Sequence, residues 1–155
     1  MKNDWLIWLA IGALLIGATG TGVYVMARGL RNNNPGNIRH GSNQWQGMSA
    51  EQTDNAFVQF DDPVYGIRAL AKLLKNYQSN YGLVTVREII NRWAPPSENE
   101  TGSYVEHVAR IVGVNPDARI NVDEKIVPLV TAIIKHENGL QPYDPETIAR
   151  GISLA

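Results

Sequence analysis

The sequence places one glutamate, Glu137, where the pKa of its carboxyl group is expected to be raised. An apolar run from Thr131 leads to Glu137 and Gly139 follows, so the pattern predicts a helix that ends close to the carboxylate. The carboxyl end of a helix disfavours a negative charge and should raise the pKa of Glu137. An acid that keeps its proton near neutral pH can protonate the leaving oxygen of a glycosidic bond. An ordinary surface glutamate at a frayed helix end explains the same pattern, so both interpretations stay open.

An amide-rich turn is the second candidate for chemistry. Residues 32–38 read Asn-Asn-Asn-Pro-Gly-Asn-Ile, and a Trp-Gln-Gly segment begins at Trp45. Amide side chains both donate and accept hydrogen bonds, and aromatic faces stack on the apolar faces of sugars. We therefore expect Asn34, Asn37 and Trp45 to bind a glycan. The alternative is a loop whose asparagines satisfy their own backbone, as is common in turns.

A polar connection at residues 92–104 supplies further candidates. It carries Trp93 and Tyr104, which we expect to contact a glycan, and Glu98, the reserve candidate for a second catalytic carboxylate. Tyr143 is a further aromatic residue expected to bind the glycan. For Glu98 the alternative is a solvated side chain that merely favours the positive end of the following helix.

The composition argues against several other kinds of site. The 155 residues include no cysteine, so neither disulfides nor thiol chemistry is possible. His40, His107 and His136 do not have the spacing of a zinc site, and no metal or other cofactor is expected. The chain has 14 Lys and Arg against 15 Asp and Glu, so it lacks the basic character of a nucleic-acid-binding protein.

Local signals predict a mainly α domain, or an α+β domain with a minor sheet in the irregular region at residues 32–60. Capping residues and glycines mark the expected helix ends. The first expected helix runs from Asp62-Pro63 to Gly82, and the second from the Thr85–Glu88 capping box through Trp93. A third helix runs from Thr101 or Ser103 to Gly113, and a fourth ends at about Asn138, with Pro128 either at its start or at a kink. The last helix runs from Asp144 to Gly151.

Residues 5–27 form an uncharged and largely apolar run with Trp5, Trp8 and Tyr24 near its ends. As a helix it would be on the order of 35 Å long, enough to cross a hydrocarbon core of roughly 30 Å. We therefore expect a transmembrane anchor at residues 1–27 and a single domain at residues 28–155. A cleaved signal peptide is the alternative, and the flanking charges leave the orientation in the membrane open.

Four motifs in order resemble a group of small phage and prophage proteins. They are RNNNPGNIR…WQG, GIRAL…LLKNY, TVREIINRWAPPSENET and AIIKHENG, and together they extend from Arg31 to about Ala155. Proteins of that group are described as virion structural proteins or as muralytic enzymes of the lysozyme-like class. The resemblance implies a lysozyme-like domain, and several lysozyme-like families are known to manage with one catalytic glutamate.

A more distant resemblance, to flagellar-type N-acetylglucosaminidases, implies a changed order of segments. In those enzymes a helix ending in Glu-Ser-Gly precedes a segment of the kind Asn-Leu-Phe-Gly-Ile-Lys. Here the matching turn at residues 33–38 comes first, and Glu137-Asn-Gly comes near the other end of the chain. This order implies a circularly permuted lysozyme-like domain, in which Glu137 must lie beside residues 33–38.

These observations predict a membrane-anchored phage enzyme that cleaves the glycan strands of peptidoglycan during genome entry or lysis. Glu137 would act as general acid and then as general base, in a lysozyme or a lytic transglycosylase. The protein would reside in the virion or in the host inner membrane, with other virion proteins as further partners. The alternatives are a non-catalytic virion structural protein that links membrane and capsid, and a pure glycan-binding module.

Overall fold

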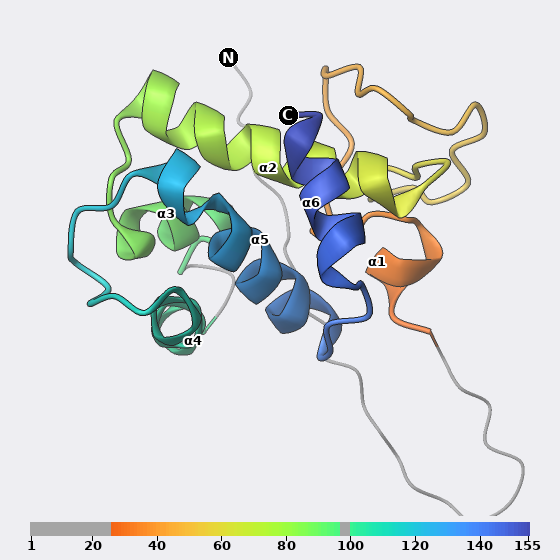
Figure 1. Ribbon diagram of the computed structural model, residues 1–155. Helices are drawn as coiled ribbons and strands as arrows, with labels where there is room; N and C mark the ends of the chain where they lie inside the picture. Colours follow the sequence, from red (N-terminus) through yellow and green to blue (C-terminus); the bar gives the residue numbers. More distant parts are fainter. Residues whose placement is uncertain (1–25, 97–99) are drawn as a thin grey trace, which may run out of the picture.

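A computed structural model describes residues 26–96 and 100–155, and within these ranges the chain forms six helices (Figure 1). The expected mainly α class is therefore confirmed. The helices are α1 (Arg28–Arg31), α2 (Pro63–Tyr81), α3 (Val86–Trp93), α4 (Thr101–Val112), α5 (Val122–Asn138) and α6 (Pro145–Ser153).

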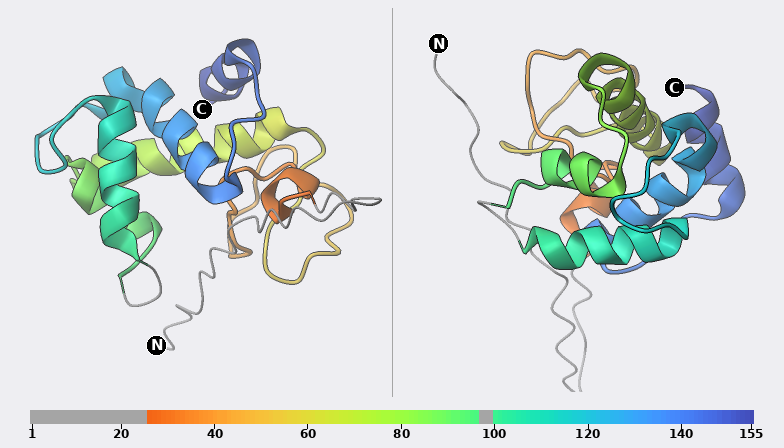
Figure 2. Two further views of the ribbon diagram at one scale, coloured as in Figure 1. Left: turned by 90° about the horizontal axis from the view of Figure 1, so that it is seen from below. Right: turned by 90° about the vertical axis from the view of Figure 1, so that its left-hand side faces the viewer.

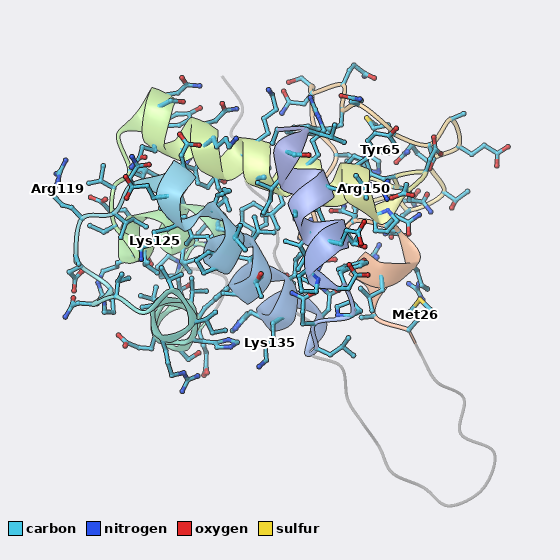
Figure 3. All side chains as sticks on the ribbon, viewed as in Figure 1. Met26, Tyr65, Arg119, Lys125, Lys135 and Arg150 are labelled. Carbon is cyan, nitrogen blue, oxygen red and sulfur yellow. The ribbon has the colours of Figure 1, made fainter. Side chains whose placement is uncertain are left out.

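Helix α5 is the centre of the fold. It contacts α1, α2, α4 and α6, and Figure 2 shows its place among them from two further directions. Pro128 lies inside the helix rather than at its start. Apolar side chains fill the space around α5, whereas Arg119, Lys135 and Arg150 are exposed at the surface (Figure 3). The residues of α5 that are completely buried are Leu129, Val130, Ala132, Ile133 and Ile134.

Most predicted helix ends are confirmed, because the capping groups act locally. Asp62 accepts a hydrogen bond from the backbone N–H of Val64 at 2.8 Å, and Gly82 ends α2 in the left-handed conformation. Thr85 and Glu88 form the predicted capping box of α3. These side chains satisfy backbone groups that a helix end leaves unpaired.

Two predicted boundaries are wrong. Neither Thr101 nor Ser103 caps α4, since the helix already begins at Thr101. Both hydroxyls donate to preceding backbone carbonyls, at 2.7 and 2.8 Å. The last helix does not stop at Gly151 but continues to Ser153, because Gly151 is buried inside the helix against α2.

Residues 32–62 form a loop beside α1 and the start of α2, coloured orange to yellow in Figure 1. The minor sheet predicted as one alternative for this region is not found among the described residues. In the part of the chain that the structure describes, only isolated β-bridges occur, two of them within this loop, Arg39 with Phe57 and Met48 with Phe60. The loop is held by side-chain amides and carboxylates instead of a hydrogen-bonded ladder.

The carboxylate of Asp54 ties this loop to α1. Two nitrogens of the Arg28 guanidinium donate to it at 2.6 Å, and the amide of Asn32 donates at 2.8 Å. The bidentate arginine holds the pKa of Asp54 far below its usual range. The pair fixes α1 against the loop that carries the amide-rich turn.

The expected transmembrane helix at residues 5–27 is corrected. Among residues 26–96 and 100–155, no helix combines the length and the apolar character that a membrane crossing requires. Met26 and Ala27, the end of the predicted span, are not helical, and Ala27 has a φ of −52° and a ψ of 140° just before α1. Residues 5–25 lie outside the described residues.

Gly66 provides a test of how tightly α2 packs against the amide-rich turn. Gly66 of α2 is buried, and a Cβ atom there would overlap the backbone oxygen of Asn33. We expect Gly66→Ala to destabilise the protein by about 1–3 kcal/mol or more, as overpacking does. The measurement is the free energy of unfolding from urea denaturation.

Gly102→Ala is the matched control, because a Cβ at Gly102 of α4 would meet nothing within 4 Å. Alanine should stabilise that exposed helical position by up to about 1 kcal/mol. Equal effects of the two substitutions would contradict the close approach of α2 to Asn33.

Candidate active site

The carboxylate of Glu137 is held by three hydrogen-bond donors from distant parts of the chain. Asn37 donates from its Nδ2 to Oε2 at 3.0 Å. The indole Nε1 of Trp93 and the hydroxyl of Tyr104 both donate to Oε1, at 3.2 and 2.9 Å. The loop, α3 and α4 thus meet at the carboxyl end of α5, and the predicted proximity of Glu137 to residues 33–38 is found.

Burial raises the pKa of Glu137 above its usual range, although the three donors act in the opposite direction. The residue keeps some solvent exposure, so its proton is not sealed inside the core. Burial, together with the Glu137 charge and hydrogen bond, raises the pKa of Tyr104 well above its usual value. Tyr104 therefore stays protonated and remains a donor at neutral pH, and Glu137 is the member of this group that can exchange a proton.

The turn that carries Asn37 is fixed by its own backbone conformation and by a hydrogen bond from the end of α5. Asn33 and Asn37 each adopt a left-handed backbone conformation with φ of 50°, which asparagine tolerates better than most residues. Asn138, next to Glu137, donates from its amide to the backbone oxygens of Pro35 and Ile134, each at 2.8 Å. The end of α5 and the turn are therefore joined by two adjacent side chains.

Gly29 of α1 packs directly behind this junction. A Cβ atom at Gly29 would lie 2.7 Å from Oδ1 of Asn138 and 2.8 Å from Oδ1 of Asn37. Both oxygens are buried and have no hydrogen-bond partner among the described residues. Sequence reasoning missed Gly29, because nothing local marks a glycine whose neighbour lies on another helix.

Asn34 was predicted to bind a glycan, but in the structure it is a buried structural residue. It is completely buried, and its Nδ2 donates to the backbone oxygens of Ile38 and Val58 at 2.8 Å. Its Oδ1 accepts from the backbone N–H of Ile38 at 2.9 Å. All of its amide atoms are used inside the protein, which leaves none accessible to a ligand.

Two histidines next to Tyr104 also belong to the site, and the sequence alone did not indicate this. The ring of His136 stacks on Tyr104 with 3.5 Å between centroids, and its Nδ1 lies 3.0 Å from Nδ1 of His107. Burial and the neighbouring His107 lower the pKa of His136 to about 4. His136 is therefore neutral at physiological pH, so it does not place a cation beside Glu137. Among the described residues, no three His, Asp or Glu side chains come together as metal ligands.

Trp93 also lines a pocket of about 210 Å³. Trp45 and Trp93, both predicted to bind a glycan, line it together with Tyr77, Arg39 and Arg92, and their role in binding stays a prediction. Glu137 does not line the pocket. Trp93 connects the two features, because its ring lines the pocket while its Nε1 holds the carboxylate.

The remaining predicted residues are placed differently. Tyr143 packs against the core beyond α5, and burial together with Asp62 raises its pKa to about 12. It neither bonds Glu137 nor lines the pocket, so the structure gives it no place in the site. Glu98 lies outside the described residues, and its role stays a prediction.

No protein-family model matches the chain. A relative, "Protein P5" of Pseudoalteromonas phage PM2, is 40% identical over 154 residues, covering 97% of this chain and 96% of the relative. The chain belongs to the family of this phage protein. The expected bacteriophage character is thus confirmed, and the match is consistent with a virion protein. The name of the relative says nothing about catalysis, so for the P5-family chain the lysozyme-like resemblance and the enzymatic activity stay predictions.

The donors to Glu137 provide a test of the electrostatics in the P5-family site. Tyr104→Phe removes the donor that lies closest to the carboxylate, and a donor to the charged form lowers a carboxyl pKa. We therefore expect the pKa of Glu137 to rise further in this variant, measured from the carboxyl carbon shift in an NMR titration. Tyr81→Phe is the control, since Tyr81 is exposed and contacts Tyr77 and Arg92 instead. An unchanged pKa in Tyr104→Phe would contradict the hydrogen bond.

The raised pKa of Glu137 also predicts how stability depends on pH. A carboxyl group whose pKa is higher in the folded state stabilises the fold when protonated, and this contribution is lost as pH rises through the folded pKa. Glu137→Gln cannot titrate, so its free energy of unfolding should increase relative to the wild type across that range. Urea denaturation of both proteins between pH 4 and pH 8 measures the difference. A difference that shrinks with pH would contradict the direction of the shift.

Proposed function

We propose that this P5-family protein cleaves the glycan strands of peptidoglycan, with Glu137 as general acid and then general base. The observation that carries the proposal is the carboxyl group of Glu137, which has a raised pKa and is oriented by three donors beside an aromatic pocket. A phage enzyme of this kind would act from the virion during genome entry, or during lysis.

Acid catalysis needs a proton that is held in place and a group that releases it near the working pH. Burial supplies the first condition by favouring the neutral carboxylic acid. The donors supply the second, because Asn37, Trp93 and Tyr104 stabilise the carboxylate that remains after the proton has left. The opposing effects keep the acid able to work in both directions.

The proposed reaction uses one carboxyl group of the described residues. No aspartate or glutamate lines the pocket among these residues. Glu137 would protonate the glycosidic oxygen as the bond to the sugar breaks, and its carboxylate would then take a proton from the incoming nucleophile. Water as the nucleophile gives hydrolysis, as in a lysozyme. A hydroxyl of the same sugar gives an anhydro product, as in a lytic transglycosylase.

A structural role is the second candidate, and a specific observation favours it. The three donors to Glu137 come from the loop, α3 and α4, so the carboxylate also connects these parts to α5. A virion structural protein could use the same buried junction only to fix its fold. Enzymatic activity separates the two candidates.

The test is cleavage of purified peptidoglycan by the full chain, followed by chromatography of the released fragments. Glu137→Gln keeps the size of the side chain but removes the transferable proton. We expect the rate to fall by at least about 10²- to 10⁴-fold, the usual value of general acid–base catalysis, with the fold retained by circular dichroism. Glu106→Gln is the control, because Glu106 is an exposed residue of α4.

Two results would contradict the assignment. If Glu137→Gln cleaves as fast as the wild type while a folded Glu98→Gln variant is inactive, the catalytic acid is Glu98 and not Glu137. If the wild type releases no fragment from peptidoglycan, the structural role replaces the enzymatic one.

A further inference from the structure

The pocket beside Trp93 is lined by two positively charged side chains. Arg39 and Arg92 both line it, and no acidic residue among those described does. The whole chain has a formal net charge of −1, so two guanidinium groups in one pocket are a local concentration of charge. Of the ion pairs among residues 26–96 and 100–155, none involves Arg92.

Aromatic rings hold both guanidinium groups in place. Arg92 lies over Tyr81, 4.0 Å from the ring centroid, and 5.4 Å from that of Tyr77. Arg39 lies 5.0 Å from the centroid of Phe57. Stacking orients the plane of a guanidinium and leaves the N–H groups at its edge directed sideways, where they match the two oxygens of a carboxylate.

The same pocket also has the features of a sugar site. Trp45, Trp93 and Tyr77 provide aromatic surface, and the exposed Asn43 adds an amide that can bond a hydroxyl or acetamido group. The pocket therefore combines aromatic surface for a sugar with cations for an acid. A neutral sugar would use only the first of these.

We propose that this arginine–tryptophan pocket binds a sugar that carries a carboxylate, with Arg92 and Arg39 as the residues that recognise the acid. The inference rests on the proposed function, since muramic acid is the sugar of peptidoglycan with such a group. Its lactyl carboxylate, or a carboxylate of the attached peptide, supplies the same chemistry. The pocket thereby distinguishes peptidoglycan from a neutral glycan such as chitin.

The position of the pocket agrees with this task. Ile38 lines it and directly follows Asn37, which holds Oε2 of Glu137, while Trp93 holds Oε1. An acidic sugar in the pocket would lie against the indole whose edge orients the carboxyl group. Recognition of the acid would then position the neighbouring glycosidic bond near Glu137.

The test measures binding to the full wild-type chain by NMR titration with three small probes. N-acetylglucosamine is neutral, N-acetylmuramic acid adds the lactyl carboxylate, and muramyl dipeptide carries its carboxylate on the peptide. None of them contains a bond between two sugars, so binding is measured without glycan cleavage. We expect N-acetylmuramic acid or muramyl dipeptide to bind at least about tenfold more tightly than N-acetylglucosamine, and the tighter of the two identifies the carboxylate.

Arg92→Gln should remove most of that preference, reducing affinity for the acidic probe about tenfold or more while changing affinity for N-acetylglucosamine less than about twofold. Arg87→Gln is the matched control on α3, because Arg87 pairs with Asp117 and does not line the pocket. It should leave all three affinities unchanged. Arg39→Gln provides a second test of the same prediction.

Equal affinity for the neutral and the acidic probes would overturn the inference, even if the protein cleaves peptidoglycan. Conversely, a preference for the acidic probe in a protein that cleaves nothing would support the pocket and contradict the proposed enzyme. An acidic preference that survives both arginine substitutions would also overturn the assignment of Arg39 and Arg92.

Discussion

The structure depends on one junction, in which the amide-rich turn at residues 33–38 closes against the carboxyl end of α5. Glu137 and Asn138 are neighbours in the sequence, and each bonds that turn from its own side chain. About 100 residues separate the partners, so the contact forms only when the rest of the domain is in place. It brings the beginning of the described chain to its last long helix and thereby places Asn37 beside Glu137.

A buried carboxylate is costly unless the protein replaces the water that it loses. Here the replacement comes from one amide, one indole and one phenol, each on a different segment. Neutral donors compensate the charge only in part, and the pKa of Glu137 stays raised. An arginine in the same place would have lowered that pKa, as Arg28 does for Asp54. The choice of neutral donors is therefore what separates an acid able to hold a proton from a structural ion pair.

Trp93 has two functions in this arrangement. Its Nε1 holds Glu137, and its ring forms a wall of the arginine–tryptophan pocket. A ligand against the ring would thus be positioned relative to the carboxyl group by a single rigid side chain. Helix α3 supplies both Trp93 and Arg92, so the short capped helix determines the relation between the aromatic surface and the positive charge.

Local signals in the sequence determined the helical class, the caps at Asp62 and Thr85 and the glycine ends at Gly82 and Gly139, because such signals act over a few residues. The position of Glu137 at a helix end also followed from its neighbours. The tertiary structure decided that Asn34 is structural while Asn37 reaches Glu137, that Gly29 and His136 belong to the site, and that Tyr143 does not. Turn composition is the same for Asn34 and Asn37, and only contacts between distant segments separate them. These contacts depend on how all six described helices pack, which no short stretch of sequence contains.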